Sequence, residues 1–287
     1  MQTSAEDQGF HGRNGPCDTG RLTTTMYESS ARSHDCPPAG SPTVVLVHGA
    51  FADGSSWNGV IERLQAKSVK VTAPPNPLRG IPIDSAYIAG VFEQTPGPLL
   101  AVGHSYGGAV ITNAAIRADN VVGLVFVAAF APDEGEALAD AEAESKDSVL
   151  MSVLVPRHYP APNGGDPGVE FAIDPARLRD AFAADLPVEQ TAVLAATQRP
   201  VSELAFSEPS GPPAWRRLRS WTVVATGDRA AGADVIRSMG ERAGAKITEL
   251  DGSHVIMISQ PQAVTDVILE ALAVVEAEAF EPIDTDR

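Results

Sequence analysis

The segment GHSYGG at residues 103–108 constrains this chain of 287 residues more than any other feature. It fits the pattern G-x-S-x-G. The apolar run Leu99–Val102 before it is typical of a buried strand, and Gly107–Ala118 after it is typical of a helix. A serine on such a strained strand-to-helix turn projects its hydroxyl, and the flanking glycines relieve the crowding of the turn. The pattern therefore predicts that Ser105 is a nucleophile.

Apolar strands alternate with amphipathic helices on both sides of this turn. The strands are expected at Thr43–Val47, Val69–Ala73, Leu99–Val102, Val121–Ala129, Trp221–Ala225 and Lys246–Leu250. The helices are expected around Trp57–Lys67, from a cap at Asp84 or Ser85 to Gln94, after the serine turn, up to Met239, and over Pro261–Glu278. Short continuous apolar strands are buried on both faces of a parallel sheet. The predicted fold class is α/β, with a mostly parallel sheet flanked by helices.

The alternation stops between Phe130 and Ser220. This stretch is rich in Ala, Asp, Glu and Pro, and it shows no convincing strand. Helical pieces are expected near Ala137–Glu144, Pro175–Ala184 and Pro187–Thr197. We expect a helical cap at about residues 131–220, inserted between two late strands. Its apolar stripe should face the mouth of the sheet above Ser105; the stripe comprises Phe171, Ile173, Leu178, Phe182, Leu186, Val193 and Leu194.

A serine hydroxyl needs a base to remove its proton, so a histidine must come from elsewhere in the chain. His254 follows the last predicted strand in the segment DGSH, just before the C-terminal helix. That loop is where a sheet of this kind delivers a base, and we predict His254 for this role. The other histidines are weaker candidates because of their positions; they are His11 and His34 near the N-terminus, His48, His104, which should pack away from Ser105, and His158.

An acid should orient the imidazole and stabilise its charged form. The chain order expected for such a site is Ser, then Asp or Glu, then His. Asp228, in the segment ATGD, directly follows the strand Trp221–Ala225 and is the predicted acid. Asp133 and Glu134, after the strand Val121–Ala129, are the alternatives. Asp251 is more typical of a turn.

Two backbone N–H groups must also meet the negative charge that develops on a substrate oxygen. One belongs to Tyr106, the residue after the nucleophile. The other should come from the loop at residues 48–51, after the first strong strand, and Ala50 is the predicted donor. These two amides are the predicted oxyanion hole.

Composition excludes several other classes of protein. The chain has 21 Lys and Arg against 37 Asp and Glu, a formal net charge of −16, whereas nucleic-acid and anionic membrane surfaces are recognised by clustered cations. No apolar run approaches the ~20 residues that a bilayer crossing requires. Two cysteines are too few for a disulfide scaffold or a Cys-based zinc site, and no metal site is predicted. We expect a cytoplasmic protein.

Residues 1–42 differ from the rest of the chain. They contain both cysteines, Cys17 and Cys36, and they lack an apolar periodicity. They also lack a basic segment followed by an apolar one, which a secretory signal requires. We expect a disordered tail before a single domain at 43–287, and nothing in the sequence supports pairing of Cys17 with Cys36.

Four motifs together resemble the α/β-hydrolase superfamily. They are HGAFADGSSW at 48–57, GHSYGG at 103–108, ATGD at 225–228 and DGSH at 251–254. The first motif and the short Pro-rich turn look like the branch of small-molecule esterases, methyl-esterases and hydroxynitrile lyases. This resemblance covers about residues 43–279. It implies a cap above the active site and no cofactor.

The resemblance implies a serine hydrolase that cleaves a small-molecule carboxylic ester, or a lactone, through an acyl-enzyme intermediate. A non-catalytic ligand-binding receptor and a lyase on the same fold are the alternatives. The lyases of this branch carry a lysine beside the catalytic histidine, where this chain has Val255. Epoxide hydrolases and dehalogenases carry Asp at the position of Ser105. Both departures favour the ester hydrolase.

Overall fold

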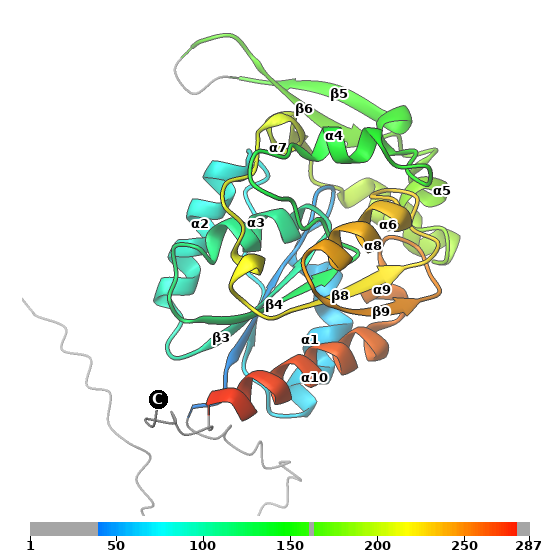
Figure 1. Cartoon of the computed structure of the whole chain (residues 1–287). Helices are drawn as coiled ribbons and strands as arrows, with labels where there is room; N and C mark the ends of the chain where they lie inside the picture. Colours follow the sequence, from blue (N-terminus) through cyan, green and yellow to red (C-terminus); the bar gives the residue numbers. More distant parts are fainter. Residues whose placement is uncertain (1–39, 161–163, 280–287) are drawn as a thin grey trace, which may run out of the picture. The chain divides into compact units, whose positions relative to one another are not determined.

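A computed structural model describes residues 40–160 and 164–279 of the chain (Figure 1). The described residues belong to one compact unit, Asp35–Arg287. Most of the predicted N-terminal tail, with Cys17 and Cys36, lies outside the described residues, so the expectations for it stay predictions. In the described part of the chain, no helix is both long enough and apolar enough to cross a membrane.

A six-stranded parallel sheet forms the centre of the domain. Its strands, in spatial order, are β2 (Val71–Thr72), β1 (Thr43–Val47), β3 (Leu99–His104), β4 (Val121–Val127), β8 (Ser220–Ala225) and β9 (Lys246–Leu250). Every neighbouring pair is parallel. Strands β3 and β8 are buried along their whole length, as their continuous apolar sequences predict. The chain adds β2 on one side of β1 and β3 on the other, so the strand order reverses there, and ligands of α/β sheets bind at such a switch point.

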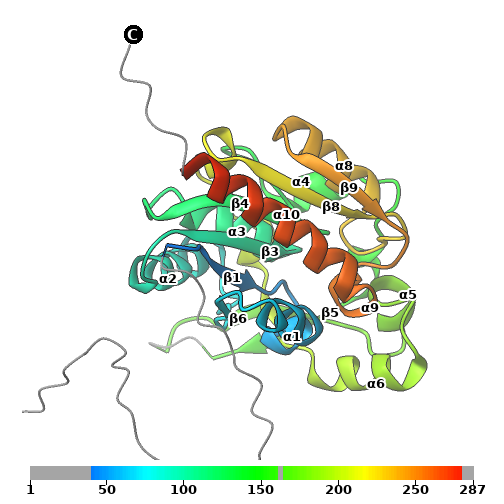
Figure 2. The ribbon, with the colours of Figure 1, turned by 90° about the horizontal axis from the view of Figure 1, so that it is seen from below.

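Helices cover both faces of this sheet. They are η1 (Gly54–Trp57), α1 (Asn58–Ala66), α2 (Ile81–Gln94), α3 (Tyr106–Ala114), α8 (Ala233–Arg242), α9 (Ile256–Ser259) and α10 (Pro261–Ala279). Helices α1 and α10 pack together on one face, and α2 packs against α3 on the other (Figure 2). Helix α2 begins at Ile81, before the predicted cap, because the buried Asp84 carboxylate instead accepts hydrogen bonds from the backbone of Arg79 and Gly80.

The insertion between β4 and β8 contains the predicted helices but also strands. Its elements are α4 (Leu138–Ala143), η2 (Leu150–Val153), β5 (Leu154–Tyr159), β6 (Gly168–Ile173), α5 (Leu178–Phe182), α6 (Val188–Thr197), β7 (Val201–Ser202), α7 (Leu204–Ser207) and η3 (Ala214–Arg216). Strands β5, β6 and β7 form a separate antiparallel sheet, so the expectation that the insertion has no strand is wrong. Pro156 within the largely exposed β5 hides the strand from pattern analysis, and an edge strand tolerates it.

Candidate active site

Ser105 lies on a strained turn between β3 and α3. Its backbone has φ 53° and ψ −126°, a conformation that residues other than glycine rarely adopt. The turn is so tight that a Cβ on Gly103 would lie 2.6 Å from the carbonyl carbon of Gly107. The glycines of the motif are therefore required for close backbone approach. Strain of this kind is typical of a functional position.

Asp228 and His254 form a buried pair on the two loops that follow β8 and β9. Because these strands are parallel neighbours, their carboxyl ends bring the two loops together. The distance from Asp228 Oδ2 to His254 Nδ1 is 2.7 Å, and each side chain is only 1% exposed. The carboxylate can only accept, so Nδ1 carries the proton and Nε2 keeps its lone pair. The backbone N–H groups of Ala230 and Ala231 donate to Asp228 Oδ1 at 2.9 and 3.0 Å.

His104 joins the serine turn to the loop of His254. Its Nε2 donates to the carbonyl oxygen of His254 at 3.0 Å, and the two ring centroids lie 4.7 Å apart. Trp57 packs edge-on against its other side. Burial lowers the pKa of His104 well below its usual range, and the neighbouring His254 lowers it further, so His104 is neutral. His104 is a buried packing residue, as predicted, and its hydrogen bond also fixes the backbone of His254.

No hydrogen bond joins Ser105 Oγ to the His254 ring in the described part of the chain. Ser105 is nevertheless next to His104, which contacts His254 directly. Nucleophile–base hydrogen bonds are often long without substrate and shorten when it binds. The fold thus brings the three predicted residues together at the carboxyl ends of the parallel strands.

The loop at residues 48–51 packs against the serine turn. A Cβ on Gly49 would lie 2.6 Å from Ser105 Cβ, so this position also needs glycine. His48 holds the loop: Nδ1 donates to the Gly49 carbonyl at 2.9 Å, and Nε2 accepts from the Asn76 backbone at 2.9 Å. Burial lowers the pKa of His48 to about 4, which keeps this acceptor free of a proton. Ala50 is buried in this fixed loop beside Ser105.

The side chain of Tyr106 is anchored away from the serine. Its hydroxyl donates to Asp84 Oδ2 at 2.7 Å, and burial raises the pKa of Tyr106 well above its usual range. Tyr106 is also the first residue of α3, so its backbone N–H is among those that the helix itself leaves unpaired. That N–H is available to an acceptor beside Ser105.

The alternative acids lie elsewhere. Asp133 Oδ1 accepts from the Arg216 guanidinium at 2.6 Å in a surface ion pair, and Glu134 is exposed. Asp251 is also exposed, and its nearest side-chain partner is Thr226 Oγ1, 3.5 Å away. Among the residues that the structure describes, only Asp228 contributes a carboxylate bonded to the His254 ring.

Aromatic side chains of the insertion pack around His254 and the 48–51 loop. The ring centroid of Phe182 lies 5.0 Å from that of His254 and 6.2 Å from that of Phe51. Phe206 stacks on Phe51 at 6.5 Å, and Phe171 contacts Phe206 at 6.4 Å. The predicted apolar stripe thus reaches the site through Phe171 and Phe182, whereas Val193, expected in the same stripe, is exposed to solvent. Phe51 and Phe206 were not among the predicted residues.

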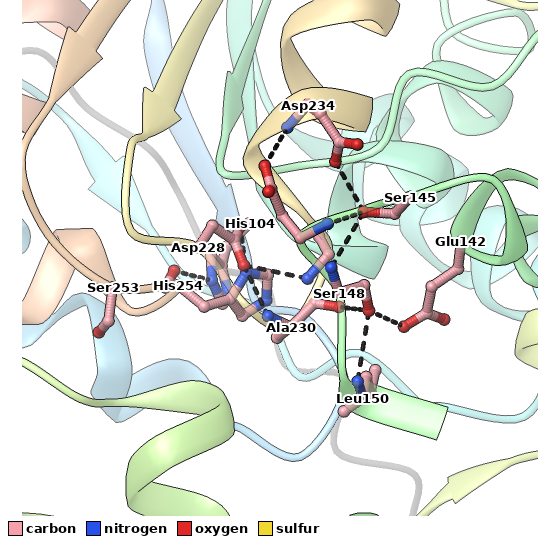
Figure 3. A network of polar contacts seen from close by, with 12 residues as sticks. His104, Glu142, Ser145, Ser148, Leu150, Asp228, Ala230, Asp234, Ser253 and His254 are labelled. Atoms are coloured by element: carbon pink, nitrogen blue, oxygen red, sulfur yellow. Dashed lines mark hydrogen bonds and ion pairs between the residues drawn. The ribbon is translucent and has the colours of Figure 1, made fainter. Parts of the chain in front are cut away.

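Two carboxyl groups of the insertion also reach the loops of Asp228 and His254, and no sequence pattern indicated them. Asp185 accepts hydrogen bonds from both the backbone N–H and the hydroxyl of Ser253, the residue before His254. Glu142 of α4 is 4% exposed and lies near the Asp228–His254 pair (Figure 3). Within residues 40–160 and 164–279, no cluster of three or more His, Cys, Asp or Glu could hold a metal ion.

Several solved structures are similar to this domain along almost their whole length. Polyneuridine aldehyde esterase matches with a TM-score of 0.69 and 21% identity, over 80% of this chain and 99% of that one. A pyrethroid hydrolase from Sphingobium faniae JZ-2 matches at 0.66 and 20%, over 81% and 97%. A methylesterase from Arabidopsis matches at 0.67 and 18%, over 81% and 99%. At these identities the likeness shows a shared fold.

A search of curated proteins found no match. The model of the alpha/beta hydrolase family matches residues 44–267, which include the serine turn and both loops of the buried pair. On this match, and with the parallel sheet and the connections described above, the chain belongs to the alpha/beta hydrolase family.

Proposed function

We propose that the protein is a serine hydrolase that cleaves a small-molecule carboxylic ester through an acyl-enzyme. The observation that carries this proposal is the buried Asp228–His254 pair, 2.7 Å apart, on loops next to the strained turn of Ser105. A buried carboxylate paired with a histidine beside a serine on a strained strand-to-helix turn is the arrangement that acyl transfer requires. Lactone hydrolysis is the same reaction on an internal ester.

In the first half of the reaction, Ser105 Oγ attacks the ester carbonyl while His254 Nε2 removes the hydroxyl proton. Asp228 holds the imidazole through Nδ1 and stabilises the cation that forms on it. The tetrahedral oxyanion is held by the backbone N–H groups of Ala50 and Tyr106. Protonated His254 then gives its proton to the leaving alcohol, and the acyl group stays on Ser105.

In the second half, water replaces the alcohol. His254 Nε2 removes a proton from the water as it attacks the acyl carbonyl, the same amides hold the second oxyanion, and the proton returns to Ser105 as the acid leaves. The ring of Phe182 beside His254 excludes bulk water from this position and supplies apolar surface to a substrate. The names of the similar structures, two esterases and a pyrethroid hydrolase, support an ester substrate.

The experiment that tests the proposal uses p-nitrophenyl acetate. The wild-type protein should release nitrophenol and, in rapidly quenched samples, gain the mass of one acetyl group on the peptide that contains Ser105. Ser105→Ala should abolish both signals. The kcat/KM values for a panel of short-chain, aryl and lactone esters then rank the substrates.

Two other outcomes would replace the proposal. A receptor on this fold would bind such compounds without releasing nitrophenol. A lyase would release cyanide from a cyanohydrin and leave esters intact, although Val255 occupies the place of the lysine that such lyases carry. Turnover that persists in Ser105→Ala would rule out the acyl-enzyme.

A further inference from the structure

Glu142 is a buried carboxyl group to which the mechanism above gives no role. It lies on α4 of the insertion and is 4% exposed. Its Oε1 lies 2.9 Å from Ser148 Oγ, while its Oε2 is buried and has no hydrogen-bond partner in the described part of the chain (Figure 3). An ionised carboxylate with one contact would be costly at such a place.

The contacts of Ser148 determine where the protons are. Its hydroxyl oxygen lies 2.6 Å from the Ala230 carbonyl oxygen, which can only accept, so the single hydroxyl proton of Ser148 points to Ala230. The 2.9 Å contact with Glu142 Oε1 then needs a proton from Glu142. This arrangement is satisfied when Glu142 is a neutral carboxylic acid that donates to Ser148 Oγ.

The chain of hydrogen bonds continues to the catalytic pair. The carbonyl of Ala230 and the N–H of Ala231 belong to one peptide unit, and that N–H donates to Asp228 Oδ1 at 3.0 Å. A donor on the carbonyl oxygen polarises an amide and strengthens the bond that its N–H makes. Asp228 Oδ2 in turn accepts from His254. Three hydrogen bonds thus run in one direction from Glu142 to Asp228, and Asp228 also accepts the hydrogen bond from His254 on its other oxygen.

We propose that Glu142, as a neutral acid, is a positioning residue for Asp228, acting through Ser148 and the peptide unit between Ala230 and Ala231. This proposal rests on the proposed function, because it assigns a role to a residue of the insertion in the same reaction. Through Glu142, the position of the Asp228 carboxylate depends on how the insertion packs. Glu142 touches no reacting atom.

The electrostatics around Glu142 agree with this geometry. Burial raises the pKa of Glu142 to about 7, the charge of Asp228 also raises it, and His254 lowers it. A hydrogen bond donated by Ser148 would lower this pKa, but the Ser148 proton points to the Ala230 carbonyl instead. Helix α7 also packs on α4, but its flanking Glu203 is exposed. Glu208, at its other end, faces Gly80 and Asp84. Above its pKa, Glu142 would lose the proton that Ser148 Oγ accepts, and the chain would be interrupted.

Two substitutions of Glu142 distinguish the effect of its hydrogen-bond donor from the effect of its side-chain volume. Glu142→Gln keeps an uncharged donor at every pH, so kcat for p-nitrophenyl acetate should stay within about threefold of wild type, and the fall in kcat above about pH 7 should disappear. Glu142→Leu removes the donor, so kcat should fall about tenfold at every pH with KM nearly unchanged. The downfield NMR signal of the proton on His254 Nδ1 should move in Glu142→Leu and stay in Glu142→Gln.

Serine variants in the same segment provide the matched comparison. Ser148→Ala should lower kcat about as much as Glu142→Leu, and the double variant should lose little more, because both act through one chain of contacts. Ser152→Ala is the control, since that exposed hydroxyl only donates to the Val149 carbonyl. Far-UV circular dichroism and urea unfolding check that each variant is folded.

The outcomes distinguish this proposal from the proposed function. If the wild type fails to turn over any ester, the function is wrong, and the NMR signal of His254 alone tests the positioning role. If the wild type is active while Glu142→Leu keeps its kcat and its His254 signal, Glu142 is not a positioning residue. A loss of kcat in Glu142→Gln as large as that in Glu142→Leu would equally overturn it.

Discussion

Asp228, His48 and His104 are buried polar residues around the candidate site, and hydrogen bonds fix the positions of their side chains. Asp228 accepts three hydrogen bonds, two from its own loop and one from His254. His48 and His104 are buried without charge, and each fixes a loop beside Ser105. Because a buried polar group that loses its partner costs about 1–3 kcal/mol, each of these residues is sensitive to substitution.

The assignment of the acid is tested by amide substitutions. Asp228→Asn keeps the size of the side chain but removes the charge that stabilises the imidazolium and favours the required tautomer, so kcat should fall by about 10⁴. Asp133→Asn and Glu134→Gln are the controls and should stay within about threefold, because both side chains lie at the surface. Steady-state kinetics on one good ester measures all three. A larger loss in Glu134→Gln than in Asp228→Asn would move the acid to the loop after β4.

Glu142 should also give the stability of the protein a distinctive dependence on pH. Its pKa is raised from 4.5 to about 7 in the folded protein, so its neutral form favours folding below about pH 4.5. That contribution, about 3 kcal/mol from about 1.4 kcal/mol per unit, is lost as the pH rises to about 7. Urea unfolding of wild type and Glu142→Gln at several pH values measures it. The free energy of unfolding of the variant should fall less over this range.

The stability of the wild type alone cannot test this prediction, because the titration of His48 also makes stability depend on pH. The pKa of His48 is lowered from 6.5 to about 4, so the protein loses stability from His48 as the pH falls through that range. This trend is opposite to that of Glu142, and the wild-type curve alone mixes the two. The difference between wild type and Glu142→Gln isolates Glu142, and parallel curves would show that its pKa is not raised.

At the scale of elements, the insertion contacts the loop of Asp228 and the loop of His254 separately. Segment 142–150 is bonded to the loop of Asp228 through Ser148 and Ala230, and Asp185, after α5, holds the loop of His254 through Ser253. Phe182 of α5 and Phe206 of α7 pack on the 48–51 loop. The insertion thus supports the loops of Asp228 and His254 as well as the 48–51 loop.

Truncation of Phe182 should change which esters the protein prefers. Its ring packs between His254 and Phe51, so Phe182→Ala enlarges the site and should shift the kcat/KM ratio of a bulky to a short ester by ~10–200-fold. Val193→Ala is the control on the same insertion, because that side chain is 60% exposed and should leave the ratio unchanged. Kinetics on the two esters measures the ratio. An equal loss on both would mean that Phe182 only supports the fold.

At the scale of the whole molecule, local signals explain which parts could be predicted. Strand β9 has the predicted bounds, and Ser105, Asp228 and His254 could be proposed from the sequence because each follows a strand in a short recognisable motif. The insertion was predicted less well: β5 carries a proline and β7 has two residues, so neither has a clear period of two. Glu142 lies in an acidic segment that is typical of an exposed helix. Its burial arises only when the insertion packs on residues 228–231, which no local pattern encodes.

Residues 1–39 should not be needed for the reaction. Every group placed in or around the candidate site comes from residues 48–254, and the family match begins at residue 44. Deletion of residues 1–39 removes none of these groups, so kcat for p-nitrophenyl acetate should stay within about threefold of the full chain. Urea unfolding of both forms controls for stability, because a fall in the folded fraction would lower the rate without touching the site. A hundredfold loss of kcat in a fully folded truncated protein would place part of the active site in residues 1–39, and the site described above would then be incomplete.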